Sequence, residues 1–354
     1  MHNDILFGPL DDDSVVSFFN AIQKDAYQKI FILVDENTQQ FCLPLLVQNF
    51  ESLHNAEIIA IPEGEDQKDI ALLTQLWATL MEYEVSRNDI LINLGGGVIT
   101  DLGGFLATTY KRGMLFYNVP TTLLGMVDAA IGGKNGINFQ GVKNSIGTFN
   151  TPQKIIICPD FLATLPDEQI RSGFAEMLKH GLIADAAHFK ELSESGLESC
   201  YDIDLIQASA TIKQQIVELD FKESGLRMHL NYGHTIGHAI ESYSHELGEP
   251  LLHGFAVAYG MCVENEISYL SGVLSQQVKE KINQSILQFY PEVDHQYLQF
   301  DRLQKYMAQD KKNQGVVKIV LLEKMGLCKI HEIEDWDIIK KAISNFRNAN
   351  AAAL

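Results

Sequence analysis

The chain has few basic residues, and this shortage excludes several classes of partner. Its 354 residues include 27 lysines and arginines against 46 aspartates and glutamates, which gives a net charge of -19 at pH 7. Nucleic acids and anionic membranes both require a basic face on the protein that binds them. We therefore expect neither as a partner, and an anionic substrate must meet a local cluster of basic side chains.

Long apolar runs and closely spaced cysteines are also missing. No apolar stretch reaches the roughly 18 residues that a membrane-spanning helix requires. The first residues, MHNDILFGPLDDDS, lack the basic region and the apolar core of a signal peptide, so we expect a cytoplasmic protein. The five cysteines are widely spaced and form no CxxC pair, which disfavours a disulfide framework and a thiolate zinc site. We expect them to be buried thiols.

The order of apolar and amphipathic segments predicts two domains. Short apolar runs (IFILV, IIAI, ILINL and KIIIC) alternate with amphipathic stretches in the first part of the chain, a pattern typical of parallel strands joined by crossover helices. Helix-like segments then predominate, at 167–184, 205–219, 234–245, 254–272 and 278–289, with strand character at VVKIVLL near the end. We therefore predict a Rossmann-like α/β domain over residues 1–160 and an all-α domain over residues 161–354.

A glycine triplet, Gly95, Gly96 and Gly97, follows the run ILINL. Glycines at a turn from strand to helix let backbone N–H groups approach a pyrophosphate, and the helix N-terminus adds a partial positive charge. Asp35 ends the run IFILV, where a carboxylate could bind ribose hydroxyls. The pattern favours a dinucleotide site, and the alternative for the glycines is a tight turn with close helix packing.

The segment 118–149 combines many glycines with polar and basic side chains. Held on short turns, such groups suit a bound polyoxygenated anion, with Lys134 and Lys143 as point charges for phosphate and Asp128 for a hydroxyl. For either lysine alone, a solvated surface side chain is an equal alternative.

A glutamate and several histidines in the second half have the spacing of a metal site. His234 and His238 are four residues apart in a predicted helix, so both project from one face, and His253 follows after a loop. Together with Glu176, two imidazoles make a catalytic zinc set with positions open for substrate oxygens. The spacing leaves His238 undecided between a ligand in place of His253, a proton relay and a core histidine. The alternative for Glu176 is an ion pair with Lys179 on one helix face, which would be the better explanation if the histidines were not available.

Further polar residues stand elsewhere in the second half of the sequence. They are Lys213, Glu223, Arg227, Asn231 and the lysines Lys311 and Lys312 of a DKK turn. If most of them converge, the pocket would hold two separate anionic groups of one ligand. For the DKK turn, plain solvation is an equal alternative.

The order of the motifs GGGVITDLGGF, VPTTLLGMVDAAIGGKNGIN, GVKNSIGTF, GFAEMLKHG, LRMHLNYGHTIGHAIE and LLHG resembles that of the 3-dehydroquinate synthase family. The resemblance implies an N-terminal NAD-binding domain, a C-terminal helical domain that binds zinc or cobalt, and a homodimer. It also implies conversion of 3-deoxy-D-arabino-heptulosonate 7-phosphate to 3-dehydroquinate and phosphate. The implied steps are transient oxidation by NAD, phosphate elimination, re-reduction and an intramolecular aldol closure.

The resemblance assigns roles to individual residues. It implies metal ligands at Glu176, His234 and His253, and proton handling by His238 and Glu223. The implied substrate contacts are Asp128, Lys134, Asn144, Lys179, Lys213, Arg227, Asn231 and a lysine of the DKK turn, with Arg112 reaching the site of a neighbouring subunit. The implied NAD contacts are Asp35, Asn37, Glu65, Lys68, Gly95, Gly96, Gly97, Asp101, Thr121, Thr122, Lys143, Thr164 and Leu165. Ser172 stands where some members contact NAD through asparagine.

Three other classes of protein fit part of the pattern. A sugar-phosphate cyclase whose substrate lacks a carboxylate would give Arg227, Asn231 and Arg112 no partner. A metal-dependent polyol dehydrogenase, the main alternative, shares the two-domain plan but has little use for so many lysines suited to phosphate. A non-catalytic NAD-binding module would be expected to have lost a ligand, and the sequence shows no such loss.

Overall fold

The chain folds as two units in the computed structural model, which describes residues 4–23, 28–140, 142–309 and 316–351. One, the α/β unit, comprises Met1–Pro166 with Tyr201–Ala210. The other, the helical unit, comprises Asp167–Cys200 with Thr211–Leu354.

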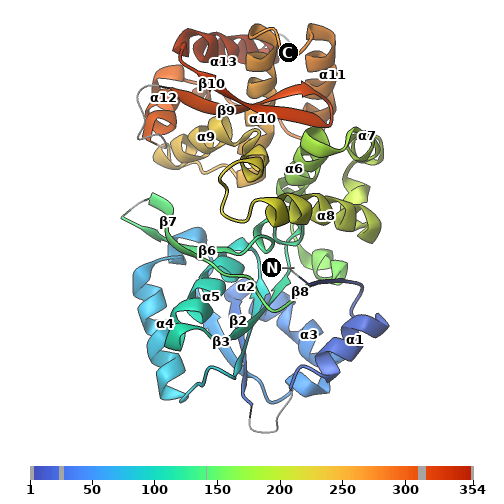
Figure 1. Ribbon diagram of the computed structural model, residues 1–354, viewed down its shortest axis with the longest axis vertical. Coiled ribbons are helices and arrows are strands. Elements are labelled where there is room, and N and C mark those ends of the chain that lie inside the picture. The colour runs from blue at the N-terminus through green and yellow to red at the C-terminus, as the bar shows by residue number, and fades with distance from the viewer. Residues whose placement is uncertain (1–3, 24–27, 141, 310–315, 352–354) are drawn as a thin grey trace. The chain divides into compact units, whose positions relative to one another are not determined.

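A six-stranded parallel sheet forms the centre of the α/β unit (Figure 1). Its strands are β1 (Ile5–Phe7), β2 (Ile30–Asp35), β3 (Glu57–Ile61), β4 (Ile90–Gly95), β5 (Leu115–Pro120) and β8 (Ile155–Ile157). Their order across the sheet is β1-β8-β5-β4-β2-β3, with every pair parallel. The four apolar runs predicted as strands are β2, β3, β4 and β8, and the prediction of an α/β fold is confirmed.

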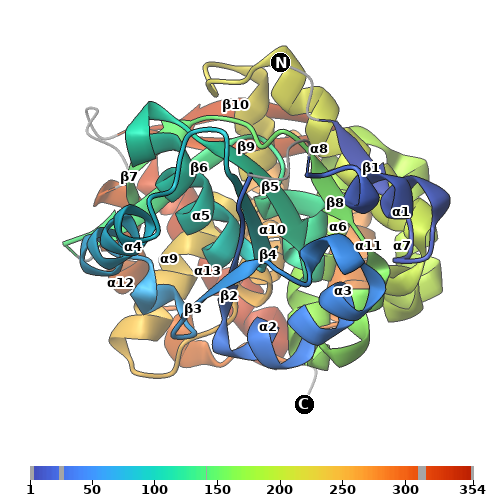
Figure 2. The ribbon, with the colours of Figure 1, turned by 90° about the horizontal axis from the view of Figure 1, so that it is seen from below.

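Helices cover both faces of this sheet. Figure 2 shows α4 (Ile70–Glu82) and α5 (Gly97–Thr109) on one side and α1 (Asp13–Asn20) and α3 (Leu43–Asn49) on the other. On β2, Phe31 and Leu33 belong to an apolar cluster with residues of α4 and α5. The alternate residues Ile32 and Val34 are fully buried as well. A strand that is buried on both faces needs a continuous apolar sequence, which explains the run IFILV.

The glycine-rich segment after the sheet's fifth strand leaves the sheet and forms a separate ribbon. It contains a helical turn (Gly125–Ala129) and the antiparallel strands β6 (Lys134–Phe139) and β7 (Val142–Phe149). Most residues of β7 are exposed, so this strand lacks the apolar pattern from which β2 and β4 could be predicted.

Helices predominate in the helical unit. They are α6 (Asp167–Ala184), α7 (Ala186–Ser195), the greater part of α8 (Ile203–Leu219), α9 (His234–Glu246), α10 (His253–Leu270), α11 (Gln276–Leu287), α12 (Phe300–Gln309) and α13 (Trp336–Ala351). Helix α10 is central, because every residue from Gly254 to Ser268 is buried and it packs against α6, α9, α11 and α13. The predicted helices correspond to α6, α8, α9, α10 and α11, so the helical character is confirmed.

The expectation of a purely α-helical second domain needs one correction. Strands β9 (Val317–Lys324) and β10 (Leu327–Ile333) form an antiparallel pair, and β9 packs against α10. The run VVKIVLL supplies the buried part of β9, where both faces are covered, because the consecutive residues Ile319, Val320, Leu321 and Leu322 are at most 3% exposed.

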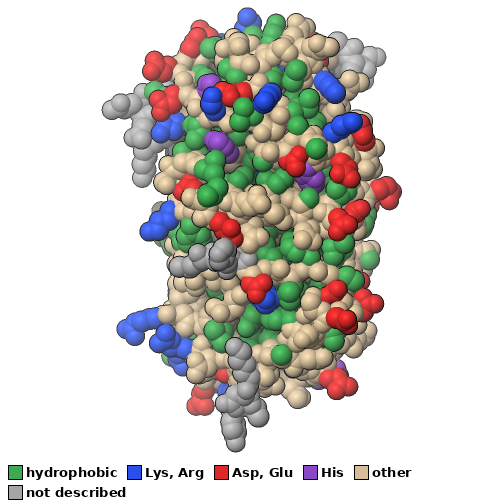
Figure 3. Space-filling model, turned by 45° about the vertical axis from the view of Figure 1, so that its right-hand side comes forward, with side chains coloured by type: hydrophobic (Ala, Val, Ile, Leu, Met, Phe, Trp, Pro, Cys, Tyr) green, Lys and Arg blue, Asp and Glu red, His purple; other side chains and the backbone are tan. Residues whose placement is uncertain are grey.

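The distribution of acidic side chains and the burial of the cysteines follow the expectations drawn from the composition. On the face drawn in Figure 3, acidic side chains are distributed widely, not gathered into one patch. All five cysteines are buried thiols, as predicted. Among the described residues, no helix is both long enough and apolar enough to span a membrane.

Candidate metal and dinucleotide sites

Three predicted metal ligands lie together in the helical unit. Glu176 comes from the middle of α6, whereas His234 and His253 are the first residues of α9 and α10. From Oε1 of Glu176, the distance is 3.5 Å to Nε2 of His234 and 3.3 Å to Nε2 of His253. One donor atom from each residue lies within 4.8 Å of the other two. We call these three residues the metal-donor set, because a carboxylate with two imidazole nitrogens binds catalytic zinc-type ions.

Glycines allow the three helices of this set to approach one another. A Cβ atom on Gly254 would overlap the carbonyl oxygen of Ser172 in α6, and one on Gly260 would overlap the carbonyl oxygen of Gly233 just before α9. The backbone N–H of Gly254 also donates to the hydroxyl of Ser172, over 3.0 Å. A larger residue at either position would push α10 away from its neighbours and separate the donor atoms. Ser172 is thus occupied in helix packing.

Both histidines of the metal-donor set have a partner on their second ring nitrogen. Nδ1 of His234 lies 3.1 Å from the carbonyl oxygen of Tyr232, and Nδ1 of His253 lies 3.2 Å from Oε2 of Glu241. Because a carbonyl oxygen only accepts, Nδ1 of His234 carries the proton and the lone pair of Nε2 points toward Glu176. Metal-binding histidines are usually oriented in this way. The residues present therefore fit a divalent metal ion.

The two histidines differ in their protonation. Burial lowers the pKa of His234 well below its usual value, and nearby Lys179 lowers it further. Burial also lowers the pKa of His253, but hydrogen bonds with Glu176 and Glu241 outweigh it and raise the pKa to about 10. His253 therefore holds a proton at neutral pH, and a metal ion would take the place of that proton.

A buried carboxylate fixes the start of α9. Glu264 of α10 is fully buried and accepts hydrogen bonds from the backbone N–H groups of Gly233, over 2.6 Å, and Ile236, over 3.3 Å. The N-cap residue Gly233 has a φ of 82° and provides no side-chain cap. Glu264 therefore supplies the cap from another helix and holds the turn that presents His234.

His238 lies one helical turn after His234 and is exposed, in contrast to the buried Glu176. Its ring centroid is 5.1 Å from that of His234 and 5.8 Å from that of His253. An exposed imidazole beside a metal-donor set suits proton transfer better than it suits a third ligand.

Lys179 forms an ion pair with Glu176 one turn earlier in α6, and its side chain is 1% exposed. The intrahelical ion pair considered as the alternative is therefore present, and both of its charges are buried. A buried lysine beside the metal-donor set could hold an anionic oxygen of a ligand.

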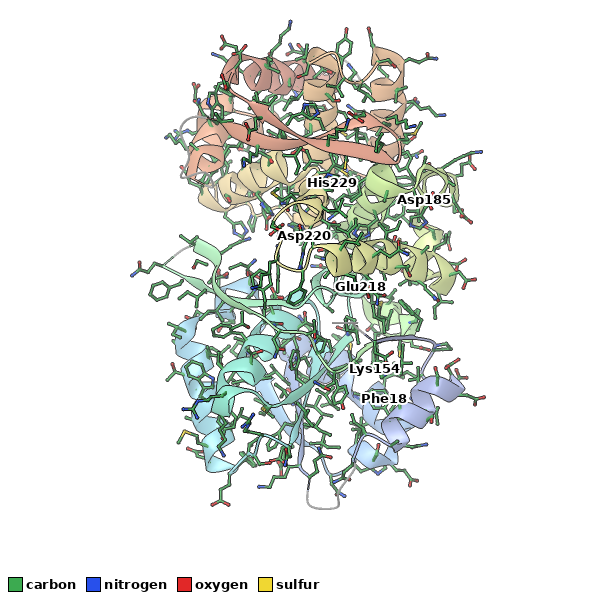
Figure 4. The ribbon with its side chains drawn as sticks, viewed as in Figure 1. Phe18, Lys154, Asp185, Glu218, Asp220 and His229 are labelled. Atoms are coloured by element: carbon green, nitrogen blue, oxygen red, sulfur yellow. The ribbon has the colours of Figure 1, made fainter. Side chains whose placement is uncertain are left out.

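A second group of predicted residues lies in the segment 220–231, which we call the Asp220 loop (Figure 4). The carboxylate of Asp220 follows α8 and accepts from the backbone N–H groups of Ser224 (2.9 Å), Gly225 (2.7 Å) and Arg227 (3.0 Å). Hydrogen bonds from Ser224, Gly225 and Arg227 hold the pKa of Asp220 well below its usual value. Asp220 thus organises the loop, and it was not predicted from the sequence as a site residue.

The Asp220 loop carries two predicted ligand-binding side chains, Arg227 and Asn231, together with Glu223. Arg227 is 2% exposed and donates from its guanidinium to the carbonyl oxygen of Phe221, over 2.7 Å. Asn231 donates to Oε1 of Glu223, over 3.2 Å. Lys213 is buried in the preceding helix, α8, at 7% exposure. Lys311 and Lys312 lie outside the described residues.

The predicted dinucleotide residues meet at the carboxyl edge of the parallel sheet. Strand β2 ends at Asp35 and pairs with β4, which ends at Gly95. The backbone N–H of Thr121, after β5, donates to the carbonyl oxygen of Gly95 over 3.2 Å. No side chain caps α5 at its N-cap residue Gly96. The edge therefore presents a carboxylate beside a glycine turn and an uncapped helix N-terminus, as a dinucleotide requires.

The glycine triplet also has a packing role. A Cβ on Gly95 would lie 2.5 Å from Cγ1 of Ile99, and one on Gly96 would lie 3.0 Å from Cγ2 of Thr122. Close packing, the alternative explanation for these glycines, is therefore present together with the open helix terminus.

Two of the dinucleotide residues already have partners within the α/β unit. Oδ1 of Asp35 accepts from the backbone N–H of Thr38 over 2.7 Å and from its hydroxyl over 2.9 Å, and so caps the helix α2 (Glu36–Phe41). Among the described residues, Oδ2 of Asp35 accepts no hydrogen bond. Asn37 donates to the carboxylate of Glu63.

A buried lysine contacts one residue predicted to bind the dinucleotide and one predicted to bind the substrate. Lys68 is 2% exposed, and its ammonium donates to Oδ2 of Asp101 over 2.6 Å and to Oδ1 of Asn144 over 2.5 Å. Asn138 joins this network, because it donates to Glu65 over 2.9 Å and accepts from the backbone N–H of Asn144 over 2.8 Å. The structure thus brings Glu65, Lys68, Asp101 and Asn144 together.

The other predicted residues of the α/β unit lie elsewhere in that unit. Lys134 and Lys143 are exposed on β6 and β7, and Asp128 is half-buried in the preceding helical turn. Arg112 is exposed after α5, at a φ of 64°. Thr164 ends a short 3-10 helix, and Leu165 follows it.

Solved structures share this fold. A 2-epi-5-epi-valiolone synthase from Streptomyces hygroscopicus subsp. jinggangensis, with NAD+ and Zn2+ bound, superimposes with a TM-score of 0.87 at 24% identity, over 99% of this chain and 98% of its own. A 2-deoxy-scyllo-inosose synthase with carbaglucose-6-phosphate, NAD+ and Co2+ gives a TM-score of 0.84 at 22% identity, over 96% of each chain. A glycerol dehydrogenase from Schizosaccharomyces pombe gives 0.65 at 16% identity, over 99% of this chain and 90% of its own. The cyclases are thus more similar in fold than this dehydrogenase.

Sequence comparison assigns the family. The model described as 3-dehydroquinate synthase N-terminal matches residues 58–172, and that described as 3-dehydroquinate synthase C-terminal matches residues 173–313. A 3-dehydroquinate synthase of Parabacteroides distasonis is 41% identical over 330 residues, which is 91% of this chain and 92% of that protein. One of Vibrio atlanticus is 38% identical over 351 residues, or 95% and 93% of the two chains. The chain belongs to the 3-dehydroquinate synthase family.

Proposed function

We propose that this chain converts 3-deoxy-D-arabino-heptulosonate 7-phosphate to 3-dehydroquinate and phosphate, as an NAD- and metal-dependent lyase. The metal-donor set carries the proposal, because its three side chains and their hydrogen bonds fit a divalent ion in a chain that matches 3-dehydroquinate synthases over most of its length.

Glu176, His234 and His253 would hold the metal, through Oε1 of the glutamate and Nε2 of each histidine. A bound divalent ion lowers the pKa of a hydroxyl group that coordinates it. The similar synthases contain Zn2+ in one case and Co2+ in the other, so either ion is a candidate here.

NAD would bind at the carboxyl edge of the sheet in the α/β unit. The backbone N–H groups at the start of α5 would face the pyrophosphate, and Oδ2 of Asp35 would accept from ribose hydroxyls. Bound NAD supplies a reversible hydride acceptor, and because the substrate recovers its hydride the reaction consumes none.

Basic and amide side chains would hold the two anionic ends of the substrate. We assign Lys134 and Asn144 to the phosphate and Arg227, with a lysine of the DKK turn, to the carboxylate, because a guanidinium matches a carboxylate with two parallel hydrogen bonds. Lys179, Lys213, Asn231 and Asp128 are further candidates for substrate contacts.

Protons would move through the two remaining candidates. His238 is exposed next to the metal-donor set and can exchange protons with a bound hydroxyl or phosphate. Glu223, held by Asn231, is the second candidate acceptor. Homodimerisation, with Arg112 reaching the neighbouring subunit, and a cytoplasmic location stay predictions.

Two alternative activities occur on the same fold. The side chains suited to carboxylate and phosphate distinguish both of them from the proposed activity. Cyclases for substrates without a carboxylate have the same architecture, but they would leave the guanidinium of Arg227 without an anionic partner. A polyol dehydrogenase would release NADH and has no use for phosphate-binding lysines.

The test is an assay of phosphate release from the heptulosonate phosphate, with metal-loaded protein and less NAD than protein, while NADH absorbance is recorded. We expect many phosphates per NAD and no accumulation of NADH. If no phosphate is released and NADH accumulates when a simple polyol is supplied, the chain is a polyol dehydrogenase and the proposal is wrong.

A further inference from the structure

We propose that Glu241 is a positioning residue of the metal site. Its carboxylate orients His253, fixes the proton on Nδ1 and strengthens metal binding at Nε2. This inference rests on the proposed function, because it takes the metal-donor set as the metal site.

Glu241 stands on the same helix face as the histidines of α9. It follows His234 by seven residues and His238 by three, spacings that place all three side chains on one side of a helix. Its side chain is 12% exposed, so water screens its charge only in part. Helix α9 therefore places the carboxylate of Glu241 beside the metal-donor set, to which it also contributes His234.

Glu241 fixes the ring of His253 through Nδ1, the nitrogen that faces away from Glu176. Oε2 of Glu241 lies 3.2 Å from Nδ1, while Nε2 of the same ring lies 3.3 Å from Oε1 of Glu176. The imidazole thus has a carboxylate at each nitrogen. When Nδ1 donates to Glu241, the lone pair of Nε2 can point only toward Glu176, where a metal ion would bind.

His253 needs such support more than His234 does. The side chain of His253 is 26% exposed and that of His234 is 11% exposed. His234 is held by a backbone carbonyl in its own turn, whereas nothing in the backbone contacts Nδ1 of His253 among the described residues. A side chain from another helix therefore does for His253 what the backbone does for His234.

The charge of Glu241 also counters an unfavourable field. His234 and His253 are the first residues of α9 and α10, so two helix N-termini with partial positive charge lie at the metal-donor set. Such termini oppose a cation, and Lys179 adds a full positive charge nearby. A second carboxylate beside Glu176 offsets this opposition and makes the imidazole of His253 a stronger donor.

The competing role for Glu241 is to orient His238. Donor atoms of His238, Glu241 and His253 lie within 4.8 Å of one another, so the carboxylate is close to both rings. The two roles differ in what they affect: orientation of His253 acts on metal affinity, whereas orientation of His238 acts on proton transfer in turnover.

The test measures metal binding directly. Metal-free protein is titrated with Co2+ against a chelator of known affinity, and the visible absorption of the bound Co2+ reports its coordination. We expect Glu241→Ala to weaken Co2+ binding by about 10- to 100-fold, the usual effect of losing such a partner, and to change the absorption bands. Glu241→Gln keeps the shape and an acceptor oxygen but removes the charge, and we expect an intermediate loss.

Two variants make the result specific. Glu246→Gln alters another carboxylate of α9, one that contacts Tyr306 and Arg302 at the surface, and should bind Co2+ like the unaltered protein. His253→Ala should lose more affinity than either Glu241 variant.

The outcomes separate the inference from the proposed site. If His253→Ala loses Co2+ while both Glu241 variants bind it as tightly as the unaltered protein, Glu241 has no positioning role and the metal-donor set stands. If Co2+ affinity is unchanged and only kcat falls in the Glu241 variants, Glu241 acts on His238 and does not position His253. The metal-donor set stands in that case too. If the unaltered protein binds no Co2+, the metal-donor set itself fails.

Discussion

The metal-donor set and the dinucleotide edge differ in how far they are assembled before any ligand binds. In the helical unit, donor atoms from three helices meet within 4.8 Å, and both histidines have their second nitrogen fixed. In the α/β unit, Asp35 caps a helix and Lys68 pairs with Asp101 and Asn144, whereas Lys134 and Lys143 are exposed. A metal site needs fixed geometry, while NAD and an anionic substrate can reorganise the groups that bind them. We infer that the metal site is preformed and that the dinucleotide and substrate groups are completed by their ligands.

The largest effect is expected from His253→Ala. Removing a ligand of a preformed site should weaken metal binding by more than the roughly 10- to 100-fold typical of outer partners, and turnover should be lost with the metal. Metal content after dialysis and phosphate release measure the two effects. His245→Ala, at the exposed end of the same α9 helix, is the matched control. A His253→Ala protein that keeps its metal would contradict the assignment.

A smaller effect is expected from Lys68→Ala, which tests the other region. Loss of the charged hydrogen bonds to Asp101 and Asn144 should raise the KM for NAD by roughly 10-fold or more, while metal content stays unchanged. Lys154→Ala, which removes an ion pair with the more exposed Asp4, is the control. A change in metal content in Lys68→Ala would mean that the two regions are coupled before ligands bind.

Helix packing behind the metal-donor set is tested by Gly254→Ala. The added Cβ would overlap the carbonyl oxygen of Ser172, and such overpacking typically costs about 1–3 kcal/mol of the free energy of unfolding. Chemical denaturation measures this loss, and metal affinity should fall because α10 moves away from α6. Ser271→Ala, at the exposed end of α10, should leave both unchanged. An unaltered metal affinity at lowered stability would show that α10 can shift without moving His253.

The smallest effect is expected from Asp220→Asn, and it depends on pH. The pKa of Asp220 in the folded chain lies below the roughly 3.9 of an unfolded aspartate. Its contribution to stability is therefore complete above that pH and is lost as the pH falls through the lower, folded pKa. The variant should show a lower Tm than the unaltered protein at pH 7, and the difference should narrow below about pH 4. Asp66→Asn, at an exposed position, is the control, and a difference that grows in acid would contradict the assigned role.

Much of the fold could be predicted from the sequence because periodicity marks it. The run that became β2 is apolar throughout and that of β4 is apolar except for the buried Asn93, since both faces of the sheet are covered, and α6 has the predicted bounds. Strands β6 and β7 could not be predicted in the same way, because an exposed ribbon imposes no apolar pattern. Strand β9 was marked by VVKIVLL, yet a single run does not reveal its partner β10.

The residues of the candidate site could be predicted from the sequence only where they belong to a recognisable motif or have a helical spacing. The metal-donor set follows from GHTIGH, LLHG and FAEMLKHG, motifs that carry ligands at helix starts or along one helix face. Glu241 could have been found, because it continues the face of His234 and His238. Glu264 and Asp220 act on backbone N–H groups, and Lys68 reaches Asn144 across 76 residues. Such contacts arise from tertiary packing and leave no local pattern.

The most direct test of a preformed metal site is calorimetric titration of the metal-free chain with Co2+ or Zn2+, in the absence of both NAD and substrate. The account predicts one equivalent bound per chain, with protons released because the metal takes the place of the proton on His253. Binding that appears only after NAD or substrate is added would contradict it.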